Sequence, residues 1–580
     1  MKNDSLLKTV VAYVDLLVLF FIIFDLGYKA NLEVTAQKAL GLIIVTCVLL
    51  ALNMVRYRFS SIAVSKNVAR VSALINATVL GITIVAAMLS SKDSTAALLV
   101  TIRPVIEIGL VGYFVFRLLS LVRYVYEIYY NPAIVFVSSF LVLILVGAFL
   151  LMIPRATVGS ISFLDALFTA TSAVCVTGLI VVDTATTFTT TGQAIIMGLI
   201  QMGGLGILTF TSFFAFFFKG STSFKEGLNV KDFMSQESLG DVFRTAVNVV
   251  IITLGIEFIG VLLIYWNIAD VDGLENKWFF AFFHGISAFC NAGFSTLTNG
   301  LNENVVKFNY GMQWIIMALI VLGGIGHGVL INLVHYLKSR LKFNYTGTGF
   351  LPDFRVVTIN TKIVITTTTV LIVLGFLLVG VLEYNHILLE HDSTFGKITA
   401  AMFHAITPRT AGFNTSDFTL LQVPTILVII VLMWIGGSPG STAGGIKTST
   451  FALATLNIIA IARGKSRIQI FRRRISSEST SRAFAILFIS LLCIGLSTLG
   501  MLLCEPSGTD FMKIAFESFS AYCTVGLSLN LTPTLTSGSK CILIVTMFVG
   551  RIGMLNLLFG ILRELNHQFY EYPKENILIN

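Results

Sequence analysis

Charged residues are scarce in this chain of 580 residues: Asp, Glu, Lys and Arg together make up 12% of it, whereas hydrophobic residues make up 56%. The mean hydropathy of +0.88 lies far above the value for a soluble globular protein of this length. The composition therefore excludes a soluble globular protein and predicts an integral membrane protein.

Cysteine is also rare, and the seven cysteines lie scattered in or beside apolar segments. They have neither the spacing of a metal site nor that of a disulfide framework, so we expect no transition-metal site. The chain has no His-Glu-x-x-His motif and no cluster of Asp and His, which disfavours an enzyme. No Gly-x-Gly-x-x-Gly motif follows a strand pattern, so we predict that no cofactor binds to this chain itself.

Apolar runs of about 20 residues, the length that crosses a bilayer, recur along the whole chain. The predicted spanning segments are 9–28, 36–55, 71–90, 98–120, 132–153, 192–218, 242–266, 310–336, 361–382, a broken helix at 423–462, 480–503 and 540–564. Four apolar segments are too short to span, namely 161–173, 278–289, 395–407 and 510–522. The sequence therefore predicts an all-α integral membrane protein.

Each short segment leads into a loop centred on one glycine, and the four glycines recur at intervals of 114 to 119 residues. A regular internal period indicates structural repeats. The predicted domains are an N-terminal extension of about four transmembrane helices at 1–130, followed by repeats at 131–225, 226–345, 346–470 and 471–580. Each repeat contains a long helix, a short pore helix, a glycine loop and a second long helix. We expect four pseudo-symmetric repeats around one central pore.

The glycine loops are the predicted ion-binding elements. Non-helical backbone at membrane depth is tolerated only where it is buried in protein or lines a cavity. Glycine adopts positive φ without a steric penalty, and carbonyl oxygens can replace the hydration shell of a monovalent cation. No ring of acidic residues accompanies the loops, which disfavours a divalent-cation pore. The predicted filter residues are Val176, Thr177, Gly178, Asn291, Ala292, Gly293, Thr410, Ala411, Gly412, Thr524, Val525 and Gly526.

Lys and Arg concentrate in alternate loops, near 56–70, 219–244, 338–362 and 463–482. Because basic loops of membrane proteins remain in the cytoplasm, both termini are predicted to be cytoplasmic and the short segments to enter from outside. The net charge of +9 is therefore a topology signal, and we expect no nucleic-acid partner.

Two features predict a gate below the loops. The second long helix of the third repeat is rich in residues that destabilise helices, and its predicted gating residues are Gly436, Gly437, Gly440, Gly444, Gly445 and Lys447. A non-helical stretch there would obstruct the cavity. Arg551 lies near the centre of the predicted helix 540–564, where a charge is costly unless it faces water or a partner. Arg551 would repel cations or bind carbonyls of the broken stretch. The alternative for the glycine-rich stretch is a simple helix kink, and the alternative for Arg551 is a structural salt bridge with no gating role.

Four motifs occur in order at 168–179, 201–206, 408–413 and 436–447. They resemble the Trk/Ktr/HKT superfamily of potassium transporters, most closely its Ktr-type membrane subunit, and the resemblance covers about residues 130 to 570. It implies uptake of K⁺ across the cell membrane, a homodimer, control by a cytosolic nucleotide-binding ring subunit and, in some members, Na⁺ as an activator. It also implies that Arg551 lies close to the broken stretch.

The N-terminal extension departs from the family pattern, and four helices before a pore could form a voltage sensor. Arg103, Arg117 and Arg123 do not form the ladder at every third position that a voltage sensor needs, which favours a packing or dimer-interface domain. A secondary cation symporter coupled to Na⁺ or H⁺ could also use broken helices at the membrane midplane. Its repeats would usually occur in pairs, whereas this chain has four equivalent units.

Overall fold

The computed structural model describes residues 132–206, 239–346 and 357–553, except residues 275, 466, 467 and 472, together with isolated residues between 41 and 81. The predicted domain 1–130, with its spans at 9–28, 36–55, 71–90 and 98–120, lies almost wholly outside the described residues. The described part is almost entirely helical, with one short hairpin of β1 (Gln469–Ile470) and β2 (Arg473–Arg474).

A long helix, a short helix and a further helix follow one another four times and pack together. These helices are α5 (Pro132–Leu151), α6 (Phe163–Val174) and α8 (Thr190–Leu205); α11 (Leu239–Ile268), α12 (Lys277–Cys290) and α14 (Tyr310–Ile325); α16 (Ile359–Leu382), α17 (Thr394–Ile406) and α18 (Val423–Trp434); and α20 (Ser477–Cys504), α21 (Phe511–Tyr522) and α22 (Ser537–Ile552). The connecting and trailing elements are α7 (Thr184–Thr187), η1 (Gly300–Asn302), α13 (Asn304–Lys307), α15 (His327–Thr346), η2 (Ile387–Glu390), η3 (Phe418–Leu420), α19 (Thr448–Ala462) and η4 (Thr532–Thr534).

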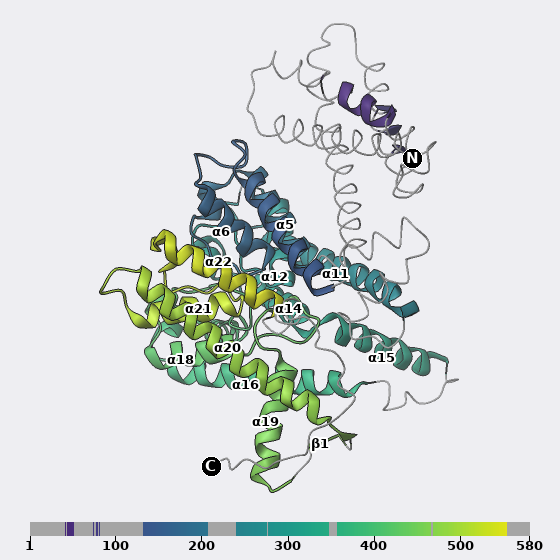
Figure 1. The fold of residues 1–580 in the computed structure, drawn as a ribbon, viewed down its shortest axis with the longest axis vertical. Helices are drawn as coiled ribbons and strands as arrows, with labels where there is room; N and C mark the ends of the chain where they lie inside the picture. Colours follow the sequence, from purple (N-terminus) through teal and green to yellow (C-terminus); the bar gives the residue numbers. More distant parts are fainter. Residues whose placement is uncertain are drawn as a thin grey trace, which may run out of the picture.

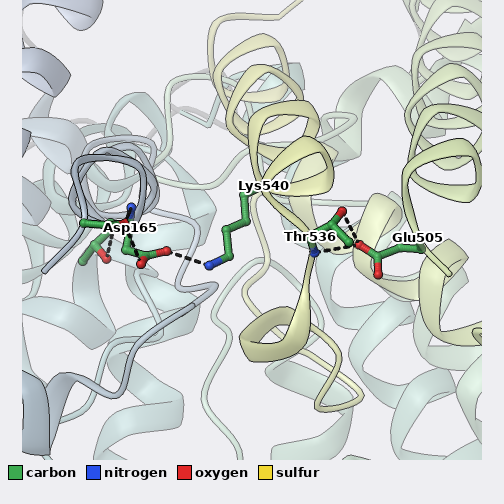
Figure 2. A network of polar contacts seen from close by, with 6 residues as sticks. Asp165, Glu505, Thr536 and Lys540 are labelled. Atoms are coloured by element: carbon green, nitrogen blue, oxygen red, sulfur yellow. Dashed lines mark hydrogen bonds and ion pairs between the residues drawn. The ribbon is translucent and has the colours of Figure 1, made fainter.

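The four units are arranged in a closed ring. The last helix of each unit packs against the short helix of the next, so that α8 meets α12, α14 meets α17, α18 meets α21 and α22 meets α6. Figure 1 shows the last of these contacts, where α22 of the fourth unit lies beside α6 of the first. At this closure Lys540 of α22 forms an ion pair of 2.7 Å with Asp165 of α6 (Figure 2).

The short helices begin at polar capping residues and bury an aromatic-rich face. The caps are Ser162, Asn276, Ser393 and Asp510, and the side chain of each accepts a hydrogen bond from a backbone N–H two or three residues later. The helix bounds agree with the predicted short segments to within two residues. At 12 to 14 residues, these helices are about 18–21 Å long and cannot cross a hydrocarbon core of about 30 Å.

Three described helices are long and apolar enough to span a membrane, namely Val247–Ile268, Ile359–Leu382 and Ser477–Cys504. They match the predicted spans at 242–266, 361–382 and 480–503. Large apolar side chains such as Trp266, Val381 and Leu503 are exposed on these helices, as expected for a surface that faces lipid. The described part of the chain is thus an all-α, multi-pass membrane protein.

The last helices of the units end earlier than the sequence predicted. Glycines with positive φ end α8, α14 and α22, namely Gly206 (72°), Gly326 (95°) and Gly553 (83°). The predicted span at 310–336 is bent, because the chain turns by 102° between α14 and α15. The prediction that Arg551 lies near the centre of a helix was wrong, because α22 ends one residue after it. Glycine accepts the left-handed backbone that stops a helix.

Candidate functional site

The four glycine loops meet at one place in the structure. A Cβ atom added to Gly178 would lie 3.2 Å from the Cα of Gly293, and one added to Gly293 would lie 3.0 Å from the Cα of Gly412. A Cβ on Gly412 would lie 3.3 Å from the Cα of Gly526, and one on Gly526 would lie 2.9 Å from the Cα of Gly178. Each glycine therefore borders the next, and the last borders the first. We call this arrangement the glycine ring.

One carbonyl oxygen from each loop lies beside a glycine of a neighbouring loop. The oxygens belong to the residues directly before the four glycines, namely Thr177, Ala292, Ala411 and Val525. The added Cβ atoms would meet these oxygens, so no larger residue fits at the glycine positions without a shift of the backbone. The ring thus places four main-chain acceptors of partial negative charge between neighbouring loops, without an acidic side chain.

The four loops share a left-handed backbone conformation at two positions. The residue two positions before each glycine has positive φ: Val176 (56°), Asn291 (59°), Thr410 (68°) and Thr524 (50°). The glycines themselves have φ between 70° and 91°. For the β-branched residues this conformation is strained, and it persists only where the surroundings enforce it. Sequence reasoning missed this strain, because valine and threonine ordinarily avoid the left-handed region.

A hydroxyl group at the end of each short helix holds the loop that follows. Ser172 accepts a hydrogen bond from the Gly178 N–H (3.0 Å), and Ser520 accepts one from the Gly526 N–H (3.1 Å). Ser287 and Thr407 instead donate to the carbonyl oxygens directly after Gly293 and Gly412, at 2.9 and 2.5 Å. Sequence reasoning missed these four groups. The signal available was a hydroxyl residue five or six positions before every glycine.

A second polar layer lies behind three of the loops. The Nε2 atoms of His284 and His404 lie 2.9 and 2.7 Å from the hydroxyl groups of Ser295 and Ser416, and both histidines are buried. The buried carboxylate of Glu517 accepts hydrogen bonds from the hydroxyl groups of Ser528 and Thr532. These contacts connect the two ends of each loop, so the histidines serve packing and loop geometry.

The predicted break in the third unit is present: residues 435–447 between α18 and α19 are not helical. We call them the broken segment. Its backbone is hydrogen-bonded to the bend between α14 and α15, where Ser438 N–H donates to Gly324 O (2.9 Å) and Gly440 O accepts from His327 N–H (3.0 Å). A Cβ on Gly436 would lie 3.2 Å from Thr410, and one on Gly444 would lie 3.0 Å from the Cys523 oxygen. The broken segment therefore lies directly against the third and fourth glycine loops.

Arg551 and Lys447 both donate hydrogen bonds to carbonyl groups of the broken segment, and Arg551 also donates to α8. The Arg551 guanidinium donates to Thr442 O and, at 2.7 Å, to Gly203 O in the last turn of α8. The Lys447 ammonium donates to Ala443 O at 2.6 Å. Arg551 thus connects α22, α8 and the broken segment. Carbonyl groups at a helix C-terminus carry partial negative charge, which suits a cation that has no acidic partner among the described residues.

Two other polar side chains, those of Ser438 and Glu257, are buried beside polar neighbours. The letters 436–440 match the Gly-x-Ser-x-Gly pattern of hydrolases, but the Ser438 hydroxyl is buried and lies 3.3 Å from the Thr448 hydroxyl. Buried Glu257 on α11 accepts a hydrogen bond from the Gln201 amide at 2.9 Å, and its second oxygen lies 3.6 Å from the Cys290 sulfur. In the part of the chain that the structure describes, no group of three or more His, Cys, Asp or Glu residues could hold a metal ion.

Buried loops that converge inside a ring of apolar helices define an integral membrane transport protein. The sequence profile of the TrkH family, described as cation transport proteins, matches residues 128–570. The chain belongs to this family, which confirms the resemblance inferred from the motifs. Because the family consists of transporters, the chain is a transporter and not an enzyme.

Individual relatives agree with this assignment. The chain is 39% identical over 432 residues to the Ktr system potassium uptake protein B of Bacillus subtilis, and the alignment covers 74% of this chain and 93% of the relative. It is 32% identical over 455 residues to the potassium/sodium uptake protein NtpJ of Enterococcus hirae, and the alignment covers 77% of this chain and 97% of the relative. The crystal structure of the potassium transporter TrkH from Vibrio parahaemolyticus has the same fold, with a TM-score of 0.59 and 18% sequence identity. The superposition covers 86% of this chain and 98% of that structure.

Proposed function

We propose that this chain takes up potassium ions across the cell membrane through a selectivity filter made by the glycine ring. The main support is the set of four carbonyl oxygens, from Thr177, Ala292, Ala411 and Val525, that converge between neighbouring loops. Such oxygens can replace the water around a dehydrated monovalent cation. In this proposal the three residues of each loop that end at its glycine bind the ion.

The choice of potassium is supported by the names of the relatives from Bacillus subtilis and Enterococcus hirae. The name of the second relative includes sodium, which supports an activating or accompanying role for Na⁺. A filter with one glycine per loop offers fewer binding sites than the Thr-Val-Gly-Tyr-Gly filter of potassium channels, so K⁺/Na⁺ discrimination should be weaker.

The broken segment is the gate in this proposal, and Arg551 holds it closed. Support comes from the place of the segment against two filter loops and from the hydrogen bond between Arg551 and Thr442 O. A guanidinium next to the ion path also repels cations. Release of the segment would remove both the obstruction and the charge.

The proposal includes four pore repeats at 131–225, 226–345, 346–470 and 471–580, cytoplasmic termini, and short helices that enter from outside. It also includes a homodimer that is controlled by a separate cytosolic nucleotide-binding ring. The word "system" in the name of the Bacillus subtilis relative supports a partner subunit. No feature of the described residues favours the ion-coupled symporter.

The test is potassium uptake in a bacterium that lacks its own uptake systems, with Gly293→Ser as the variant. The added side chain would meet Gly412, and the K⁺/Na⁺ ratio should fall by about tenfold, the effect of losing about 1.4 kcal/mol of discrimination. Gly255→Ala is the matched control, because an added Cβ there meets no atom within 4 Å. An unchanged ratio in Gly293→Ser would remove the filter assignment.

A further inference from the structure

The third glycine loop differs from the others at one position. Three residues before the glycine, the other loops carry buried cysteines, namely Cys175, Cys290 and Cys523, whereas the third loop carries Arg409. The third unit is also the one that contains the broken segment. Two departures from the fourfold pattern thus occur in the same unit, next to each other in space.

Arg409 is buried, with 7% of its surface exposed, and its Nη2 atom donates to the carbonyl oxygen of Gly436 at 3.3 Å. Gly436 is the second residue of the broken segment, and a Cβ on it would touch Thr410, the neighbour of Arg409. A buried guanidinium in a membrane is costly unless it binds a partner. Since no ion pair involves Arg409 within the described residues, the carbonyl of the broken segment fills this role.

The surroundings of the guanidinium are loosely packed on one side. A small cavity is lined by Arg409, Thr368, Ile406 and Gly437. The Arg409 Nε–H and the Thr368 hydroxyl, both buried, find no hydrogen-bond partner among the described residues. Among the described residues, the hydrogen bond to Gly436 is thus the polar contact that holds the guanidinium in place.

We propose that Arg409 is a positioning residue that couples the third filter loop to the gate. The inference rests on the proposed roles of the glycine ring and the broken segment. Arg551 holds the segment at Thr442 from helix α22, whereas Arg409 holds it at Gly436 from the filter loop itself. Movement of the segment changes the position of Arg409, and with it the carbonyl groups of Thr410 and Ala411. Opening of the gate and geometry of the filter are then linked through one side chain.

The test compares Arg409→Gln, Arg551→Ala and the double variant as full-length protein in proteoliposomes, with K⁺ flux and the K⁺/Na⁺ permeability ratio as readouts. Arg551→Ala should raise flux and leave the ratio unchanged. Arg409→Gln should raise flux and lower the ratio, each by about three- to tenfold, which corresponds to about 0.7–1.4 kcal/mol, the net contribution of one ordinary hydrogen bond. A residue with only a structural role would lower the yield of folded protein and leave the ratio of the folded fraction unchanged.

The double variant tests whether both arginines act on the same segment. If they do, its flux should stay within about twofold of the larger single variant, because contacts that share one element are not additive. Multiplied effects on flux, or a wild-type ratio in Arg409→Gln, would overturn the inference. If that variant does not fold, Arg409→Lys replaces it, since lysine keeps the charge without the planar guanidinium. Gly412→Ser separates the two proposals: an unchanged ratio there would overturn the filter itself.

Discussion

The glycine ring and the broken segment are held in different ways. In the ring, each loop is bound by a hydroxyl group of its own unit, five or six residues earlier in the chain, and this contact occurs four times. The broken segment occurs once, and besides the hydrogen bond from Arg409 of its own unit it is held from other units, by the bend after α14 and by Arg551 of α22. Local, repeated contacts favour a rigid structure, whereas single, distant contacts can be released together. In the proposed mechanism we therefore expect the broken segment to move most, and the glycine ring to change only at its third loop, through Arg409.

The largest effect should come from breaking the ring itself. In Gly526→Ala the new Cβ would lie 2.9 Å from the Cα of Gly178, and φ at this position is 91°, which disfavours alanine. We expect potassium uptake to fall by about 100-fold or more, since strain of about 1–3 kcal/mol adds to a collision between backbones. The measurement is potassium uptake, and the yield of purified protein is the second readout.

Gly495→Ala provides the control for that variant. Gly495 lies in α20, and an added Cβ meets no atom within 4 Å. Alanine favours helix by about 1 kcal/mol over glycine, so this variant should keep wild-type uptake and unfold no more easily. Equal uptake in Gly526→Ala and Gly495→Ala would contradict a ring that depends on glycine.

The next largest effect should come from releasing the gate. Arg551→Ala removes the hydrogen bonds to Thr442 and Gly203, and basal K⁺ flux should rise by about tenfold, as for loss of one hydrogen bond to a charged group. Arg482→Ala is the control, because its ion pair with Glu478 is exposed and contributes little. Flux in proteoliposomes is the measurement, and a fall in flux after Arg551→Ala would argue against a latch.

A smaller effect should follow from weakening one local contact of the ring. Ser287→Ala leaves the Phe294 carbonyl without its hydroxyl donor, and the K⁺/Na⁺ ratio should fall by about two- to fivefold, because an unpaired buried acceptor costs about 1 kcal/mol or more. Thr455→Ala is the matched control, since its hydroxyl bonds only within its own exposed helix. A rise in flux with an unchanged ratio would show that this contact belongs to the gate, and the comparison would then fail.

The smallest effect concerns a contact in the fourth unit between Glu505 at the end of α20 and Thr536 at the start of α22. Burial alone would raise the pKa of Glu505, but hydrogen bonds from Ser539 and Thr536 outweigh it and hold the pKa below its ordinary value of 4.5. Figure 2 shows the contact with Thr536, at 2.9 Å from both its N–H and its hydroxyl group. The stabilisation is complete above pH 4.5 and is lost as the pH falls through the lower pKa of the folded state.

This pH dependence is measurable as a melting temperature in detergent. The wild-type melting temperature should fall more steeply than that of Glu505→Gln as the pH decreases from 5 towards 3, by a difference worth less than about 1 kcal/mol. At neutral pH the variant should be slightly less stable than wild type. Parallel curves of melting temperature against pH for the two proteins would mean that the Glu505 carboxylate adds nothing to the contact between α20 and α22.

Much of the fold could be predicted from the sequence because the governing signals are local. The apolar length of the long helices, the polar caps of the short ones and the recurrence of Gly178, Gly293, Gly412 and Gly526 are all visible as letters. The family assignment also followed from motifs, and the profile match over residues 128–570 confirmed it. Hydrophobic length and glycine placement depend on the solvent and on the backbone alone, so no tertiary contact is needed to read them.

Only the tertiary structure decided how these elements meet. Gly553 ends α22 one residue after Arg551, and Gly326 turns the chain by 102°, although both lie in runs that read as continuous helix. The left-handed conformation of Val176 and Thr410, and the hydrogen bond from Arg409 to Gly436, have no local signal. Each depends on partners that are distant in sequence or on surroundings that enforce strain, and such forces exist only once the four units have closed into a ring.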